Sequence, residues 1–181
     1  MKISAYIAVS LDGFIARDDH SIDWLPKPDL NSNEDYGFDD FFSSVDALVM
    51  GRNTYEIVVN SGYQWPYKEK KVFVLTNRNI EIADNIKEYV FSISGTPNEI
   101  INNLQQNNIQ HIYIDGGKVI QSFLKLNLIN EITITQIPIL LGSGIPLFSK
   151  LNNDIYLSVI SSKLYKNDLI KNHYQINYSN K

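Results

Sequence analysis

The sequence predicts an α/β fold of three layers, in which helices cover both faces of a mixed, mostly parallel β-sheet that ends in an antiparallel C-terminal hairpin. Short apolar runs alternate with helical patterns as far as residues 118–124, which is typical of parallel β/α units. Beyond them, apolar and polar residues alternate, which favours antiparallel strands. The length of 181 residues fits a single domain, residues 1–181.

Composition narrows the classes of function. The formal net charge is −4 without a run of like charges, so no nucleic-acid partner is expected. There is no cysteine, and the three histidines are dispersed, which excludes thiolate catalysis and predicts no metal site. The first apolar stretch is interrupted by Ser4, Ser10 and Asp12, unlike a signal peptide or a membrane span. We expect a cytoplasmic protein with a small-molecule substrate and no membrane partner.

The first strand is expected at residues 3–9, because this run is almost wholly apolar. It ends in the turn Ser10-Leu11-Asp12-Gly13, at the edge of the sheet where open α/β proteins bind ligands. Residues 17–33 are polar apart from Trp24-Leu25 and predict a long functional loop. A helix is expected at 35–44, with three phenylalanines on one face.

The middle of the chain repeats a pattern of strand, turn and helix. A strand at 47–50 leads into Gly51-Arg52-Asn53-Thr54, one at 71–76 leads into Asn77-Arg78, and another is expected at 88–93. The clearest helix follows, with Thr96 as N-cap, Pro97 at the first helical position and Glu99 completing a capping box.

The run 111–115 predicts a buried strand, and Gly116-Gly117 joins it to a helix with an apolar face at 118–124. Paired glycines leave no side chain in front of the helix N-terminus, which suits a phosphate group. The alternative is a turn that binds nothing. Further on, a strand is expected at 131–135, and residues 155–165 and 169–178 are expected to form a hairpin.

Three strand ends carry residues suited to phosphate: 51–54, 76–78 and 115–117. If the strands are parallel, all three lie at one edge of the sheet, where Arg52 and Arg78 and two helix N-termini would meet a pyrophosphate and a further phosphate. NADP fits this description. The alternative is that both arginines are surface residues that form weak ion pairs.

The segments 49–56, 74–78 and 114–117 resemble, in order and spacing, the cofactor-binding motifs of the dihydrofolate reductase superfamily. Trp24-Leu25-Pro26 resembles its mobile active-site loop. The segments 10–13 and 142–148 are more similar to the reductase domain of the bifunctional riboflavin-biosynthesis deaminase-reductase, whose zinc-binding deaminase motifs are missing here. The resemblance implies a three-layer reductase fold, NADPH as hydride donor and a homodimer.

The resemblance also assigns cofactor-binding residues. It implies that the turn after the second strand holds the pyrophosphate, through Gly51, Arg52, Asn53 and Thr54. The turn after the third strand would recognise the 2′-phosphate, through Thr76, Asn77 and Arg78. The glycine turn would line the diphosphate, through Gly116, Gly117, Lys118 and Val119, and Ala8 of the first strand would face the nicotinamide.

For catalysis, Asp35 falls where the folate enzymes keep their active-site carboxylate, and a buried acid there would relay a proton as hydride arrives. The alternative for Asp35 is a helix N-cap. Asp12 and Asp115 are the other acids, from the riboflavin branch, and Asp115 stands where that branch places an acid that contacts substrate.

Aromatic residues predict a flat apolar slot for a pterin-like or pyrimidine ring, the alternative being ordinary core packing. The slot residues are Trp24, Phe38, Phe42 and Tyr55. Gly142 and Gly144 are expected to form a backbone turn near the nicotinamide or the substrate.

Two departures from the folate enzymes argue against dihydrofolate as substrate. Their three-glycine turn is Asp115-Gly116-Gly117 here, and the arginine that binds the folate glutamate aligns near Lys70, which lacks the planar fork. We therefore expect an NADPH-dependent reductase similar to 5-amino-6-(5-phosphoribosylamino)uracil reductase, acting on a small heterocyclic or carbonyl substrate. The alternatives are a nucleotide-binding module without catalysis and a structural dimer.

Overall fold

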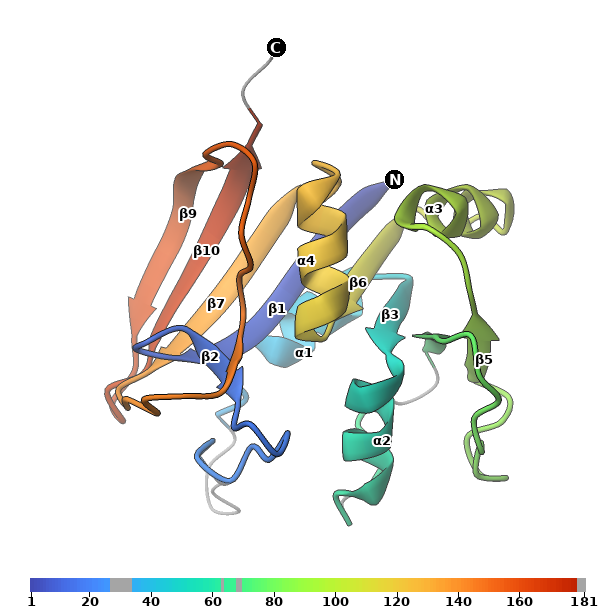
Figure 1. Cartoon of the computed structure of the whole chain (residues 1–181), viewed down its shortest axis with the longest axis horizontal. Coiled ribbons are helices and arrows are strands. Elements are labelled where there is room, and N and C mark those ends of the chain that lie inside the picture. The colour runs from blue at the N-terminus through green and yellow to red at the C-terminus, as the bar shows by residue number, and fades with distance from the viewer. Residues whose placement is uncertain (27–33, 63, 68–69, 179–181) are drawn as a thin grey trace.

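The computed structural model describes residues 1–26, 34–62, 64–67 and 70–178. An eight-stranded sheet runs through the molecule in the order β5-β4-β3-β6-β1-β7-β10-β9 (Figure 1). Its strands are β1 (Lys2–Ser10), β3 (Ala47–Gly51), β4 (Lys71–Leu75), β5 (Val90–Ile93), β6 (His111–Asp115), β7 (Glu131–Ile137), β9 (Tyr156–Leu164) and β10 (Ile170–Asn177).

The sheet is mixed, as predicted. β1 pairs in parallel with β6 and β7, and β3 pairs in parallel with β4 and β6. β4 and β5 are also parallel, whereas β10 runs antiparallel to both β7 and β9. The three-layer α/β fold with an antiparallel C-terminal hairpin is therefore confirmed.

Helices cover both faces of the sheet. They are α1 (Phe38–Ser44), α2 (Arg52–Asn60), α3 (Pro97–Gln106) and α4 (Gly117–Lys125). α3 and α4 bury Ile100, Leu104, Ile120 and Phe123 against one face, in a cluster of aliphatic residues. α1 and the buried Tyr55 of α2 belong to a second, more aromatic cluster. Figure 1 shows α4 in front of the strands and α1 behind them.

Two helices follow directly from their sequence. The Thr96 hydroxyl accepts a hydrogen bond from the Glu99 N–H, and the Glu99 carboxylate accepts one from the Thr96 N–H at 2.7 Å, so the capping box of α3 is confirmed. In α4 the whole predicted apolar face is buried. Such a face, rather than helix propensity, supplies most of the stability of a short helix.

The structure differs from the prediction at two places. The helix expected from residue 35 begins at Phe38, because Tyr36 and Gly37 both adopt the left-handed conformation, with φ of 58° and 79°. A small second sheet of β2 (Phe14–Ala16) and β8 (Ile145–Pro146) was not predicted. Two strands this short carry too little periodicity to be recognised. Part of the predicted loop 17–33, residues 27–33, lies outside the described residues.

No helix within the described ranges is both long and apolar enough to cross a membrane.

Candidate functional site

The carboxyl ends of six parallel strands lie along one edge of the sheet, which we call the rim. β1, β3, β4, β5, β6 and β7 all end there, because each pairs in parallel with its neighbour. The rim therefore brings together the three turns that the sequence singled out: residues 51–54, 76–78 and 115–117. This is the edge where ligands bind in open α/β sheets.

Two of these turns touch. Gly116 has φ of +90°, and a Cβ on it would collide with the Thr54 hydroxyl. A Cβ on Gly51 would lie 3.5 Å from the Val119 side chain. Because β3 and β6 are adjacent in the sheet, the N-termini of α2 and α4 are held side by side, and glycine at residue 116 is what allows the close approach.

Both helix N-termini keep free hydrogen-bond donors. Neither α2 nor α4 has a side-chain cap, and neither has an acidic residue in its first turn. The first N–H groups of a helix have no partner within the helix, and they carry its partial positive charge. The rim thus presents two neighbouring groups of N–H donors that suit the oxygens of an anion.

The cationic residues of the rim differ in availability. The Arg52 guanidinium donates to the Glu56 carboxylate at 2.8 Å, one helical turn away. Arg78 is exposed, and its N–H donates to the Thr76 hydroxyl at 3.0 Å, which fixes the turn after β4. Asn53, Asn77 and Lys118 are exposed as well. Val119 is buried, so only its backbone is available to a ligand.

Asp35 caps the entry to α1. Its two carboxylate oxygens accept hydrogen bonds from the backbone N–H groups of Gly37 at 2.8 Å and Asp39 at 2.7 Å. These bonds lower the pKa of the Asp35 carboxyl. Its side chain is exposed. Its hydrogen bonds stabilise the start of α1, although the N-cap position itself is Gly37, whereas proton relay needs a raised pKa. A catalytic role for Asp35 stays a prediction.

Asp12 organises the glycine loop near the end of β1. Its carboxylate accepts from the Ser10 hydroxyl at 2.6 Å and from the N–H groups of Leu141 and Gly142 at 3.2 and 2.7 Å. The Ser10 hydroxyl is the main cause of the lowered pKa of Asp12. This carboxyl therefore favours its charged form, and its catalytic role also stays a prediction.

Asp115 differs from the other two acids. Desolvation raises the pKa of its carboxyl from 3.8 to about 6, against the opposing effect of a hydrogen bond from the Gly116 N–H. Tyr67 and Tyr113 are buried nearby, and burial, together with the charge of Asp115, raises the pKa of both phenols. The residue keeps partial contact with solvent. Asp115 thus differs from Asp12 and Asp35 in having a raised carboxyl pKa.

The predicted aromatic slot is not assembled. Trp24 is buried in a cluster with Ile137, Tyr165 and Leu169, where Ala8 packs beside it and remains partly exposed. The other three slot residues belong to the aromatic core on α1: Phe38 stacks on Phe42 with centroids 5.4 Å apart, and Tyr55 is 2% exposed, with its hydroxyl bound to the Glu81 carbonyl.

Lys70 also has a structural role. Its ammonium group donates to the carbonyl oxygens of Ser43 and Val45 and lies 5.3 Å from the centroid of the Phe42 ring. A cation at the C-terminus of α1 satisfies the unpaired carbonyls there. This position therefore offers no fork for a substrate carboxylate.

Two tyrosines around Asp115, Tyr67 and Tyr113, were not predicted as site residues. Tyr113 stands two residues before it on β6, so both side chains lie on the same face of the sheet. That spacing was a usable signal. Tyr67 comes from a distant loop, and nothing local in the sequence links it to Asp115.

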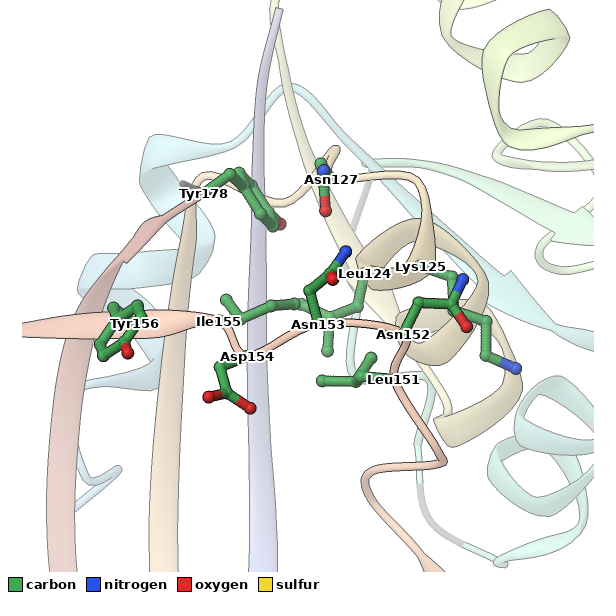
Figure 2. Close-up of a pocket in the computed structure, with 10 residues that line it drawn as sticks. All are labelled: Leu124, Lys125, Asn127, Leu151, Asn152, Asn153, Asp154, Ile155, Tyr156 and Tyr178. Atoms are coloured by element: carbon green, nitrogen blue, oxygen red, sulfur yellow. The ribbon is translucent and has the colours of Figure 1, made fainter. Parts of the chain in front are cut away.

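A cavity lies away from the rim. It has a volume of about 760 Å³ and is formed at the C-terminal end of α4 by Leu124 and Lys125 and by the segment 151–156 (Figure 2). It lies at the opposite end of α4 from the glycine turn.

In the part of the chain that the structure describes, no three His, Asp or Glu side chains are grouped to hold a metal ion.

The fold defines a class of protein, the dihydrofolate reductase-like α/β domains. Residues 1–171 match the family described as the RibD C-terminal domain. The chain belongs to this family.

Individual relatives agree with this assignment. The uncharacterised protein YwjB of Bacillus subtilis (strain 168) is 39% identical over 165 residues, covering 91% of this chain and 92% of YwjB. The crystal structure of a putative riboflavin biosynthesis protein from Shewanella sp. PV-4 is 40% identical, with a TM-score of 0.88 and coverage of 98% and 100%.

A more distant relative shows the fold alone. The deaminase/5-amino-6-(5-phosphoribosylamino)uracil reductase of Thermotoga maritima is 14% identical, with a TM-score of 0.73 over 96% of this chain and 56% of that chain.

The raised pKa of Asp115 predicts that this carboxyl destabilises the fold at neutral pH. The folded state holds the proton more tightly than the unfolded state, so the contribution of the group to stability is complete below pH 4 and is lost as the pH rises through about 6. Asp115→Asn, which stays neutral, should raise the free energy of unfolding by about 2 kcal/mol at pH 7.5 and leave it unchanged at pH 4.

Urea unfolding at both pH values measures the effect. Asp12→Asn is the matched control, because its lowered pKa predicts a loss of stability at pH 7.5. Equal stability of wild type and Asp115→Asn at pH 7.5 would contradict the raised pKa.

Proposed function

We propose that this protein is an NADPH-dependent reductase that transfers hydride to a small heterocyclic substrate of the riboflavin-precursor type. The observation that carries the proposal is the pair of uncapped helix N-termini, α2 and α4, held side by side at the rim by Gly116. A diphosphate needs several N–H donors converging from two directions, and the two neighbouring N-termini supply them.

The residues of the rim fit the rest of the cofactor. The exposed Arg78, in a turn fixed by Thr76, is available for the 2′-phosphate of the adenosine. Ala8 is small and partly exposed near the carboxyl end of β1, which leaves room for a flat ring. NADPH, when bound, supplies the hydride.

The protein must then supply one proton, so that hydride and proton together reduce the substrate by two electrons. Among the three acids considered, Asp115 is the one whose pKa is raised, to about 6. An acid with a pKa near the working pH is the most effective proton donor. We assign this role to Asp115, beside the substrate, with Tyr67 and Tyr113 maintaining its dry surroundings.

Membership of the RibD C-terminal domain family supports the proposal. A relative of known description acts as a 5-amino-6-(5-phosphoribosylamino)uracil reductase, and that substrate class is the first to test here.

The decisive experiment combines cofactor binding with turnover. NADPH fluorescence titration should give saturable binding, and a panel of dihydrofolate, the riboflavin precursor and simple carbonyls should show NADPH oxidation with the precursor type. Binding without oxidation of any substrate would favour a nucleotide-binding module without catalysis. No saturable binding at high micromolar NADPH would reject the proposal.

Arg78→Ala should weaken NADPH binding by about tenfold or more and leave NADH binding nearly unchanged, because only NADPH carries the extra phosphate. Parallel titrations with both cofactors measure this difference. Lys87→Ala removes an exposed cation that pairs with Asp84 away from the rim, and it should affect neither cofactor. Equal losses of NADPH and NADH in Arg78→Ala would refute the assignment.

Asp115→Asn should lower kcat by about 100-fold with little change in the Kd for NADPH, the range expected for loss of a general acid. Because the acid must be protonated, wild-type kcat/KM should fall as the pH rises through about 6. Asp35→Asn is the comparison: a larger loss of kcat there would restore the catalytic prediction for Asp35.

We also propose that the protein is a homodimer that pairs through β9. This strand forms one edge of the sheet, and all nine of its residues are exposed. An apolar edge strand exposes unpaired backbone groups that natural proteins cover. Two copies of one strand pair antiparallel about a twofold axis, so a second copy covers this edge. The apolar residues along it are Tyr156, Leu157, Val159, Ile160 and Leu164.

Val159→Lys should convert the dimer to a monomer, because it places a charge in the apolar contact. Light scattering coupled to size-exclusion chromatography measures the mass. Leu126→Lys changes an exposed leucine at the C-cap of α4, outside β9, and should leave the dimer intact. A wild-type protein that is monomeric at 100 µM, well above the concentrations at which specific dimers form, would reject this interface.

A further inference from the structure

A second hollow lies on the face of the sheet that α1 covers, away from the rim. Its volume is about 250 Å³. Its floor is formed by the amino-terminal halves of β1, β6 and β7 together with β10, and α1 and Ser161 of β9 form its two walls. We call this hollow the α1 groove. Tyr6 and Phe41 line it with rings whose centroids are 4.9 Å apart.

Two ammonium groups, those of Lys2 and Lys171, line the α1 groove, and the carboxylates of Asp35 and Glu34 also act on Tyr6. The one carboxylate that lines the groove in the described chain, Glu131, accepts hydrogen bonds from Lys2 at 2.9 Å and from His173 at 3.1 Å. Lys2 and His173 thus both bind the same carboxylate, that of Glu131. His111 is held by the Ser44 carbonyl at 2.9 Å on Nδ1, and its Nε2 lies 2.9 Å from the Ser4 hydroxyl.

Lys171 brings the additional positive charge. Its ammonium group donates to the Tyr36 carbonyl at 2.6 Å and lies near the ring faces of Tyr6 and Tyr165, at 6.0 and 5.8 Å from their centroids. An ammonium has three N–H donors, and the carbonyl and the rings do not neutralise its charge. Asp35, whose charge interacts with it, directs both of its oxygens to backbone N–H groups.

We propose that the α1 groove is a second binding site, separate from the rim, for a small organic anion of one aromatic ring. Lys171 binds the carboxylate or phosphate group of the ligand, and the rings of Tyr6 and Phe41 contact its flat part. The volume suits a single ring, and a charge-assisted hydrogen bond in a half-buried groove supplies the selectivity for an anion. The ligand would join α1 to β10, since it touches both elements.

Benzoate and benzamide are matched probes, because they share the ring and differ in charge. Isothermal titration calorimetry at pH 7 should give benzoate a Kd on the order of 1 mM, as expected for a ligand of this size, and benzamide should bind at least about tenfold more weakly. Equal affinities would overturn the proposal.

Three substitutions test whether benzoate binds in the α1 groove. Lys171→Met should weaken benzoate by about tenfold, the value of one charge-assisted hydrogen bond. Ser161→Phe, on the exposed wall, should do the same by filling space, and it tests the site if Lys171→Met is poorly folded. Lys150→Met removes an exposed lysine that does not line the groove and should bind benzoate normally.

Testing each ligand on the variant of the other site shows whether the groove and the rim bind independently. Arg78→Ala should retain benzoate binding, and Ser161→Phe should retain NADPH binding. If Arg78→Ala abolishes benzoate binding, the anion occupies the rim and the groove carries no site. If NADPH fails to bind while benzoate binds as described, the proposed function fails and the groove stands.

Discussion

The close contact between the β3–α2 and β6–α4 turns is the constraint on which the candidate site depends. Parallel pairing of β3 and β6 places the two turns next to each other. The backbone of Gly116 then approaches Thr54 so closely that no side chain fits between them. Two helix N-termini are forced together, and neither has a side-chain cap. Placing two positive helix ends side by side is unfavourable alone, and an anion relieves that repulsion.

Three aspartates of the candidate site differ in carboxyl pKa because their surroundings differ. Asp35 and Asp12 accept backbone N–H groups, which lowers their pKa values and ties them to the framework. Asp115 is desolvated beside buried tyrosines, which raises its pKa. The same residue type therefore builds a helix entry, fixes a glycine loop and provides an acid, and only the third role conflicts with the stability of the fold at neutral pH.

The sequence predicted the sheet and the rim well because their signals are local. Apolar runs marked the strands, the capping box marked α3, and glycines marked the turns where backbones meet. The small sheet of β2 and β8, the buried position of Tyr55 and the role of Lys70 at the end of α1 could not be predicted in this way. Each depends on contacts between residues far apart in the chain. Asp35 differs from these cases because its partners are local: the resemblance suggested a catalytic acid, the residue type suggested a helix cap, and its carboxylate accepts hydrogen bonds from two backbone N–H groups two and four residues away.

The Tyr36 carbonyl is bound by three side-chain donors from different parts of the chain. It accepts hydrogen bonds from the Tyr6 hydroxyl, the Tyr165 hydroxyl and the Lys171 ammonium group, although a carbonyl oxygen has only two lone pairs. The Tyr36 carbonyl therefore stays hydrogen-bonded when any one of the three donors is lost and the other two remain. Loss of one of these donors leaves the carbonyl with two hydrogen bonds, whereas loss of two leaves it with one, so the position of Tyr36 beside β1 and β10 does not depend on a single side chain.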